Sequence, residues 1–405
     1  MKRKLCAQII SFVLSLLMLL TFFAGCKSGG NTENTTPESE PISVVASADD
    51  ETSSAPETTE NPYSSALFTL NGPGENVEIH SKIQKLLLED SYDNATKYGK
   101  GSGELSRPSA VKFSWTFDGE ICGAVKGYTV KISENEDLSD PWIYTTDKCN
   151  LSIYNVKIGT RYYWNVTADT EKATVISETG TFSTAADWPR NLAIDGVTNA
   201  RDLGGRATAN GGYTRQGLIY RTARLNANSS TTLEIKESGI DTMINQLGIK
   251  TEIDLRRKDE AGVTASPLGE SVKYYNCPID NAKDIIGSKA GIAEVFHIMA
   301  DKNNYPLFFH CSIGTDRTNL IAFILNGICG VAESDLYYDY VFSNLGLINA
   351  TRPASQIQAS DHYVTAFKKL EGETLADKLR TYLRSIGVTD AEMDSIIEIF
   401  RQDPS

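Results

Sequence analysis

Apolar and polar side chains alternate with a period of two along the first half of the chain. The alternation is clearest in Val111–Trp115, Tyr128–Ile132 and Tyr162–Ala168, which are separated by residues typical of turns. Successive side chains of a strand point to opposite faces, so this pattern predicts strands that bury one face. We therefore expect an all-β domain over residues 63–186. Its segment Ile79–Leu88 fits either a short helix or an irregular edge.

The pattern changes after Trp188, where short apolar runs alternate with longer amphipathic ones. Strands are predicted at Lys250–Leu255, Val272–Cys277 and Pro306–Phe309. Helices are predicted at Gly291–Asn303, Arg317–Leu325, 333–343, 361–384 with a break at Gly372, and 390–401, where Thr389 and Glu392 form a capping box. Strands that alternate with helices favour an α/β domain over residues 187–405, with a parallel-rich central sheet flanked by helices.

The first residues have the features of an export signal. Lys2, Arg3 and Lys4 precede an uncharged stretch from Leu5 to Gly25. Its end, Phe22-Phe23-Ala24-Gly25-Cys26, resembles the bacterial lipobox. The resemblance implies that residues 1–25 are a lipoprotein signal peptide and that Cys26 is lipidated, which makes the protein an extracytoplasmic membrane lipoprotein. The alternative is a plain, uncleaved membrane anchor.

Residues 26–62 are rich in Ser, Thr, Glu, Asn and Pro and hold almost no large apolar side chains. Such a segment buries too little apolar surface to offset the entropy lost on ordering, so we expect a disordered stalk. An anchor followed by a polar stalk would hold the two domains away from a membrane surface.

Charge and cysteine content narrow the classes of partner. The formal net charge of −13 argues against general binding to nucleic acids or anionic membranes. An anionic ligand would then need a local group of cations, and the candidates are Arg201, Arg206, Arg221, Arg224, Arg256 and Arg257. Cys122 and Cys149 are the only two cysteines of the all-β domain, so a disulfide between them is a candidate. No Cys/His spacing is typical of a metal site, and no cofactor is expected.

The candidate chemistry is concentrated in His310–Thr318, between a predicted strand and a predicted helix. A strand–loop–helix of this kind turns backbone N–H groups toward one point at a helix N-terminus, which is an anion site. The same dipoles should lower the pKa of the Cys311 thiol below its free value of ~8.5. Arg317 can grip two phosphate oxygens at once with its planar guanidinium, and the Thr318 hydroxyl can donate to the sulfur.

This run resembles the Cys-x5-Arg loop of the cysteine-dependent phosphatases. Three further segments, Asn199–Gly205, Gly217–Thr222 and Ile253–Arg256, match one branch of them. Together they resemble the bacterial secreted tyrosine/lipid phosphatase family over residues 190–400, whose loop is His-Cys-x-x-Gly-x-Asp-Arg. The resemblance implies hydrolysis of phosphotyrosine, and sometimes of phosphoserine, phosphothreonine or phosphoinositides. Lipid-active members often carry a lysine where this chain has Thr315, which weakens the phosphoinositide alternative.

The loop chemistry and the resemblance assign roles to individual residues. Cys311 is expected to attack phosphorus and form a phosphocysteine that water then hydrolyses. The equatorial oxygens would be held by Arg317 and by the backbone N–H groups of Ser312, Ile313, Gly314 and Thr315. His310 is expected to orient the loop.

The leaving group needs a proton, and two carboxylic acids are candidates. Asp316 lies in the loop, at the position that the resemblance implies. Asp280 follows a predicted strand, where other cysteine phosphatases carry a mobile acid loop. Arg221 and Arg256 either line the substrate mouth or hold the fold through pairs with Asp254 or Asp202.

The all-β domain carries a second resemblance. Gly159-Thr160-Arg161-Tyr162, leading into Trp164, resembles the tyrosine corner and strand F of a fibronectin type III sandwich, with Trp115 in the opposing sheet. The resemblance implies a spacer or docking module, and a cell-wall or surface ligand is one candidate partner.

Three functions follow from these observations. The first is an exported, membrane-tethered phosphatase acting on phosphotyrosine, with dual specificity as an extension. The second is an inositol phosphate or phosphoinositide phosphatase. The third is a non-enzymatic surface-binding protein, against which the intact Cys311, Arg317 and Thr318 argue.

Overall fold

The computed structural model describes residues 63–226, 233–280 and 288–404. The signal peptide predicted at 1–25, the lipidation predicted at Cys26 and the stalk predicted at 26–62 lie outside these residues. Within the described ranges, no helix is both long enough and apolar enough to span a bilayer.

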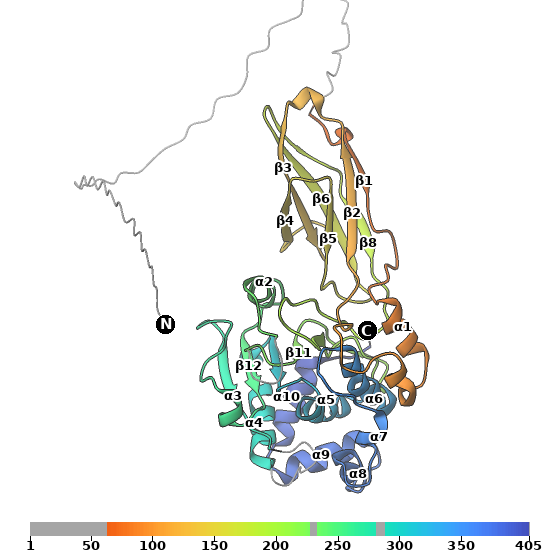
Figure 1. Ribbon diagram of the computed structural model, residues 1–405, viewed down its shortest axis with the longest axis vertical. Helices are drawn as coiled ribbons and strands as arrows, with labels where there is room; N and C mark the ends of the chain where they lie inside the picture. The colour runs from red at the N-terminus through yellow and green to blue at the C-terminus, as the bar shows by residue number, and fades with distance from the viewer. Residues whose placement is uncertain (1–62, 227–232, 281–287, 405) are drawn as a thin grey trace, which may run out of the picture. The chain divides into compact units, whose positions relative to one another are not determined.

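Two antiparallel sheets make up most of the N-terminal half, which we call the sandwich (Figure 1). One sheet has the order β1 (Phe68–Asn71), β2 (Val111–Phe117), β5 (Asn150–Ile153). The other has the order β4 (Trp142–Thr146), β3 (Val125–Ser133), β6 (Arg161–Thr170), β7 (Thr174–Ile176), and β8 (Gly180–Ser183) also pairs with β6. Side chains of both sheets share one apolar core, which includes Trp115 and Trp164.

The Tyr162 hydroxyl ties the start of β6 to the chain before it. It accepts a hydrogen bond of 2.7 Å from the Lys157 N–H, five residues upstream. This is the geometry of a tyrosine corner. The resemblance of the whole sandwich to fibronectin type III domains stays a prediction.

The segment before Arg107 was expected to belong to the all-β domain, but part of it packs on the C-terminal half. It forms helix α1 (Lys82–Glu89), which begins at a capping box of Ser81 and Gln84, and the 3-10 turn η2 (Tyr92–Lys97). Leu87 and Ala95 are buried in the core of the C-terminal half. The reason is the helical spacing of its apolar side chains, which must be buried together and find their partners on the helices of the C-terminal half.

The C-terminal half, which we call the α/β body, is built on a five-stranded sheet. Its order is β13 (Lys273–Asn276), β12 (Thr251–Asp254), β14 (Leu307–His310), β11 (Ile219–Thr222), β9 (Arg201–Asp202). The first four strands are parallel and β9 is antiparallel. The predicted parallel-rich sheet is therefore confirmed.

Alternate residues of the sheet enter two different cores, so both faces are covered. Ile253, Leu307 and Phe309 enter the larger core. It is covered by α4 (Lys289–Met299), α5 (Asp316–Ile328), α6 (Glu333–Val341), α9 (Leu375–Ser385) and α10 (Asp390–Phe400). Tyr220 and Phe308 enter the smaller core, beside α2 (Glu237–Asp241) and the π-helical turn η4 (Thr242–Gln246).

Shorter elements complete the described chain. They are η1 (Ser65–Leu67), η3 (Glu120–Cys122), β10 (Tyr213–Thr214), α3 (Lys258–Ala261), η5 (Lys302–Asn304), η6 (Phe342–Leu345), α7 (Ala354–Ile357), α8 (Tyr363–Lys368) and β15 (Arg401–Gln402). The predicted break at Gly372 separates α8 from α9, and the predicted Thr389–Glu392 capping box opens α10. The helix predicted over Gly291–Asn303 stops at Met299, and a 3-10 turn follows it.

Cys122 and Cys149 do not form the candidate disulfide. Both are free thiols, with Cys122 buried and Cys149 exposed. The Cys149 thiol instead donates to the Tyr128 hydroxyl at 3.4 Å.

Candidate active site

The predicted catalytic loop lies where β14 ends and α5 begins. Its residues Cys311–Thr315 connect His310, the last residue of β14, to Asp316, the first of α5. Gly314 has a φ of +67°, and a Cβ on it would lie 2.3 Å from the carbonyl oxygen of Thr222 on β11. Real side chains do not fit so close to a backbone oxygen, so the loop requires glycine here.

The carbonyl groups of this loop all have partners behind it. The carbonyl oxygen of Cys311 accepts from His310, that of Ser312 from Arg224, and that of Ile313 from Asn199. The Gly314 carbonyl oxygen accepts from both Asn199 and Arg221. The heavy-atom distances run from 2.7 Å to 3.2 Å. Since C=O and N–H point in opposite directions across a planar trans peptide, these contacts turn the loop N–H groups forward.

Those forward N–H groups are free to bind an anion. The N–H groups of Ser312, Ile313, Gly314 and Thr315 have no hydrogen-bond acceptor within the described part of the chain. The first N–H groups of α5 have no partner inside the helix either. The loop is therefore an anion hole, with Cys311 at its head.

The Cys311 sulfur is buried, with 2% of the residue exposed. Burial alone would raise the pKa of its thiol, but the charge of Arg317 and hydrogen bonds from the Thr318 hydroxyl and N–H lower it below its ordinary value. The Thr318 hydroxyl is buried and has no hydrogen-bond partner elsewhere among the described residues, so it is available to the sulfur. These contacts favour the thiolate form of the sulfur.

Arg317 is oriented by Glu260 on α3, a residue that the sequence analysis did not single out. The two terminal nitrogens of Arg317 donate to the two Glu260 oxygens at 2.6 and 2.8 Å. The Ser312 hydroxyl also donates to Glu260, and it accepts from Arg317 at 3.2 Å. The hydrogen bonds from Arg317 lower the pKa of Glu260 to about 2. The guanidinium plane is therefore fixed beside the anion hole.

His310 lies behind the loop, as expected. One ring nitrogen is 2.9 Å from Glu252 and the other is 3.2 Å from the Cys311 carbonyl oxygen. Burial would lower the pKa of His310, but the charge of Asp254 and the hydrogen bond to Glu252 raise it above its ordinary value. A protonated ring donates from both nitrogens, which matches both contacts.

Comparison with known proteins identifies the family. A sequence model described as the Tyrosine phosphatase family matches residues 192–402, just over half of the chain. The chain belongs to the tyrosine phosphatase family. We therefore call Cys311–Arg317 the phosphatase loop.

Two bacterial relatives are similar over parts of this region. A protein of Cupriavidus necator named as a tyrosine-protein phosphatase is 28% identical over 180 residues, which are 38% of this chain and 63% of the relative. A tyrosine-protein phosphatase of Nostoc commune is 26% identical over 120 residues, 24% of this chain and 41% of the relative. The chain thus spans less than two thirds of the length of these relatives.

A yeast protein and a solved structure are also similar to parts of the chain. The tyrosine-protein phosphatase-like protein OCA2 of Saccharomyces cerevisiae is 27% identical over 104 residues, 24% of this chain and 52% of that protein. The core catalytic domain of the PP-IP phosphatase SIW14 from S. cerevisiae shares 14% identity, with a TM-score of 0.25. The match covers 40% of this chain and 93% of the solved domain.

The six arginines predicted as an anion-attracting group do not form one patch. Arg201, Arg206 and Arg221 are buried, and all three form ion pairs with the Asp339 carboxylate of α6. Burial lowers the pKa of Arg201 to about 9 and that of Arg206 to about 10, with the charge of Arg221 adding to both shifts. Their positive charge is held inside the protein by one carboxylate.

Arg221 and Arg256 do not line a substrate mouth. Both are fully buried, and Arg256 pairs with Asp254 at 2.7 Å, which was the alternative expectation. Arg221 pairs with Asp339 and supports the loop carbonyl of Gly314 from behind. The reason is that β11 and β12 are central strands, so side chains at their ends enter the protein and not a surface.

The other two arginines of the predicted group also differ from each other. Arg257 is exposed and pairs with Asp259 at 3.5 Å. Arg224 donates to the Ser312 carbonyl oxygen at 2.8 Å, so it too supports the loop from behind.

Both candidate proton donors are in the described chain, in different surroundings. Asp316 accepts three hydrogen bonds of 2.8–3.2 Å from Arg352 and one of 3.3 Å from the Tyr340 hydroxyl. Asp280 is exposed, and among the described residues no hydrogen bond or ion pair joins its carboxylate to the loop. The geometry thus brings Asp316 to the site, where Arg352 orients its side chain.

Five residues of the site were not given a role by the sequence analysis: Asn199, Glu252, Glu260, Asp339 and Arg352. Asn199 opens a segment that carried the family resemblance, so its position was marked although its function was not. In the structure, Arg201 donates to the Asn199 side-chain oxygen at 2.6 Å, which leaves the amide nitrogen facing the loop. The others lie far from the loop in sequence.

The side chain of Thr315 lies behind the loop. It is fully buried, and its hydroxyl is 3.4 Å from the Asn199 amide nitrogen. Thr315 therefore offers an incoming anion its N–H and no side-chain charge.

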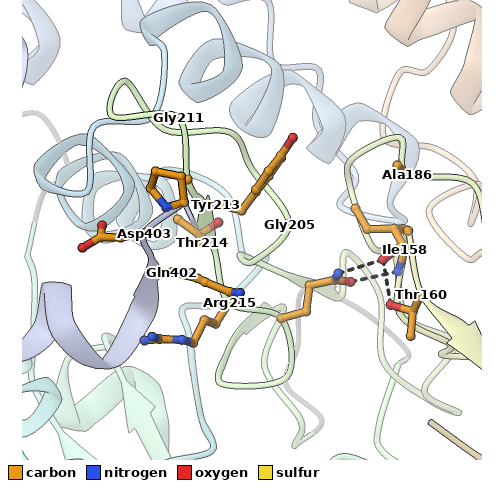
Figure 2. A pocket seen from close by; sticks show the side chains of 14 residues that line it. Ile158, Thr160, Ala186, Gly205, Gly211, Tyr213, Thr214, Arg215, Gln402 and Asp403 are labelled. Carbon is orange, nitrogen blue, oxygen red and sulfur yellow. Dashed lines mark hydrogen bonds between the residues drawn. The ribbon is translucent and has the colours of Figure 1, made fainter.

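A separate cavity of about 590 Å³ contains none of the phosphatase-loop residues. Arg215 and Asp403 lie at one end of it, and Ile158 and Thr160 lie at the other (Figure 2). Arg215 already donates to the carbonyl oxygen of Ile399 at 2.8 Å, and Asp403 would repel an anion. The cavity is unsuited to a phosphate.

Proposed function

We propose that this protein is a phosphomonoester phosphatase that acts through a phosphocysteine on Cys311, with phosphotyrosine as its main substrate. One observation carries the proposal: the buried Cys311 thiol, whose pKa is lowered, lies at the head of a loop whose N–H groups are free and whose carbonyl groups are hydrogen-bonded from behind. That arrangement matches a phosphoryl group with three equatorial oxygens.

In the first step, the Cys311 thiolate attacks phosphorus in line with the leaving oxygen. An S–P bond forms and the P–O bond breaks, while the loop N–H groups and Arg317 hold the equatorial oxygens. The leaving oxygen takes a proton from the acid form of Asp316, whose side chain is held beside the loop by Arg352 and Tyr340. Asp280 is the rival donor.

In the second step, water attacks the phosphorus of the phosphocysteine. The carboxylate that gave the proton accepts one from the water, the P–S bond breaks and inorganic phosphate forms. The hydrogen bonds from Thr318 stabilise the departing thiolate, as they do in the free enzyme.

Two features favour phosphotyrosine. The relatives from Cupriavidus necator and Nostoc commune are named as tyrosine-protein phosphatases. Thr315, which stands where lipid-active members often have lysine, faces away from the anion hole and adds no charge for a second phosphate. Dual specificity for phosphoserine and phosphothreonine would extend the same reaction to poorer leaving groups.

We further propose that the enzyme is exported and tethered to the membrane through a lipid on Cys26. The basis is the basic start, the uncharged stretch and the Ala24-Gly25-Cys26 ending of the first 26 residues. Intact mass of the mature protein should begin at Cys26 and include a diacylglycerol group. Retention of Met1, or a free N-terminus beyond residue 26, would contradict this.

The experiment that tests the enzymatic proposal is a phosphate-release screen of the purified chain. It compares phosphotyrosine peptides, phosphoserine peptides, phosphoinositides and inositol phosphates, each with wild type and Cys311→Ser. We expect phosphotyrosine peptides to be hydrolysed fastest and Cys311→Ser to lose turnover while it still binds a phosphate analogue. Faster release from inositol compounds would select that alternative. Binding without release from any substrate would select a non-enzymatic surface protein.

A further inference from the structure

Residues Gly99–Leu105, which we call the strap, run along the segment that carries Arg352. Backbone hydrogen bonds of 2.6–3.0 Å join the two segments: Gly101 to Asn344, Leu105 to Leu345, and Ile348 and Asn349 to Gly101. The Thr351 hydroxyl adds a hydrogen bond of 3.3 Å to the Lys100 carbonyl. The segment that precedes α7 is therefore held by a part of the chain more than 200 residues earlier.

The strap is itself fixed in place. Gln84 of α1 is fully buried, and its amide donates to the carbonyl oxygens of Leu105 and Arg107 at 2.8 Å each. Gly101 has a φ of +68°, and a Cβ on it would lie 2.1 Å from the Ala350 carbonyl oxygen. The two backbones therefore approach as closely as glycine allows.

Asn344 connects the strap to Arg352. Its carbonyl oxygen accepts from the strap, and its buried side chain clamps the Arg352 backbone from both sides. The Arg352 N–H donates to the side-chain oxygen at 2.7 Å, and the amide nitrogen donates to the Arg352 carbonyl at 2.8 Å. With its backbone fixed, Arg352 reaches the Asp316 carboxylate in the geometry described above.

We propose that the strap is a positioning element of the active site, which acts through Asn344 and Arg352 on Asp316. The strap lies outside residues 192–402, the region that matches the family. This chain would therefore complete its catalytic site with support from its N-terminal half. The proposal rests on the proposed function, since it assigns the strap's effect to the residues that serve the phosphoryl transfer.

The test is a double-mutant cycle between Gly101→Ala and Arg352→Met, with Gly103→Ala as the matched control. Gly103 lies in the same strap, but a Cβ on it would meet nothing within 4 Å. In the wild-type background, Gly101→Ala should lower kcat/KM by roughly 10- to 100-fold, because small misplacements in an active site cost this much. Gly103→Ala should leave it unchanged. In the Arg352→Met background, Gly101→Ala should change kcat/KM less than about 2-fold, since coupled residues are not additive.

Additive losses in the cycle, or full activity of folded Gly101→Ala, would overturn the proposal. Hydrogen exchange gives a readout that needs no turnover: the Ile348 and Asn349 amides should exchange faster in Gly101→Ala than in Gly103→Ala. Unchanged exchange in a folded variant would also overturn it. If Gly101→Ala does not fold, Thr351→Val, which removes the milder contact with Lys100, takes its place in the cycle and decides.

The strap and the proton-donor assignment can fail separately. Asp316→Asn with no dependence on the leaving group would reject Asp316 as the donor, while coupling between Gly101 and Arg352 would still support the strap. Dependence on the leaving group without that coupling would keep the donor and reject the strap. Absence of any phosphatase activity would reject the proposed function, and the exchange measurement would still report on the strap.

Discussion

Glu260 and Arg317 face each other through two parallel hydrogen bonds of 2.6 and 2.8 Å, one from each terminal nitrogen of the guanidinium. Burial would lower the pKa of Arg317, but Glu260 and the Cys311 thiolate raise it. The pair fixes the plane of the arginine that must hold phosphate oxygens, and Glu260 also accepts from Ser312 of the same loop.

Glu260→Gln should therefore lower kcat/KM by roughly 10- to 100-fold, because the amide loses the charge and one acceptor that align Arg317. Arg317→Lys should cost more, since a point charge cannot replace the planar fork. Steady-state kinetics on a phosphotyrosine peptide measures both. Glu270→Gln is the control, because Glu270 is exposed in the same region. Equal effects of the two glutamine variants on kcat/KM would contradict the positioning role of Glu260.

The same pair predicts a pH dependence of stability. The folded-state pKa of Glu260 is about 2, below its ordinary value of 4.5. A lowered pKa means that the folded state favours the carboxylate, so its contribution to the free energy of unfolding is complete above pH 4.5 and decreases toward pH 2. Denaturation across this window should show a smaller acid loss for Glu260→Gln than for wild type. An identical loss in both would contradict the pairing.

Asp316→Asn should slow release of an ordinary phenol or alkyl alcohol by ~10²–10⁴-fold, because a poor leaving group needs the proton most. The same variant should barely affect a substrate with a strongly acidic phenol. Asp280→Asn should show no such difference between leaving groups. Kinetics with paired substrates measures the contrast, and the reverse pattern would transfer the role to Asp280.

Gly314→Ala should destabilise the protein and abolish turnover, because a Cβ there would meet the Thr222 carbonyl oxygen at 2.3 Å. Gly248→Ala is a control for backbone strain alone: its φ is also +67°, but its nearest contact is 3.9 Å, to Pro306. The control should lose roughly 1–2 kcal/mol of unfolding free energy and keep its activity. Chemical denaturation and kinetics of both variants separate the two effects, and equal losses would exclude the steric argument.

Asp339→Asn should destabilise the α/β body by roughly 3–5 kcal/mol, because it removes the carboxylate that three buried arginines share. Burial would raise the pKa of Asp339, but the charges of Arg201, Arg221 and Arg206 lower it strongly, so it is ionised when folded. Asp335→Asn, on the same helix but half-buried, is the control. Chemical denaturation measures the difference. A loss of stability no larger than that of the control would show that groups other than Asp339 neutralise the charge of the three arginines.

The sequence predicted those parts of the site that are local in the chain. The loop from His310 to Thr318 carries its own nucleophile, glycine turn and helix start, so its chemistry could be inferred from one segment. Strands β2, β3 and β6 were likewise predicted from side-chain alternation, and the Thr389 capping box from short-range spacing. The parallel sheet followed from the order of strands and helices.

What could not be predicted depends on contacts between distant segments. An arginine at the surface can bind an anionic ligand, whereas a buried arginine pairs with a carboxylate of the protein. The sequence does not show whether a side chain at the end of a strand is exposed or buried. The sequence therefore left two roles possible for Arg221 and Arg256, lining the substrate mouth or holding the fold. It also did not indicate Asp339 as the partner of Arg221. The roles of Glu260 and Arg352 could not be predicted for the same reason, because no local pattern connects either residue to the loop.

The packing of α1 and η2 on the α/β body has a consequence for how the protein can be divided. The described chain passes through the sandwich at β1, enters the α/β body at α1, returns to the sandwich at β2 and enters the body again after β8. A single proteolytic cut near residue 187 would leave two fragments that still share a buried core, because Leu87 and Ala95 of the N-terminal fragment are buried among side chains of the C-terminal one. Such a nicked protein should copurify as one particle until it is denatured, and expression from residue 187 onward would leave a hole in the apolar core where α1 belongs.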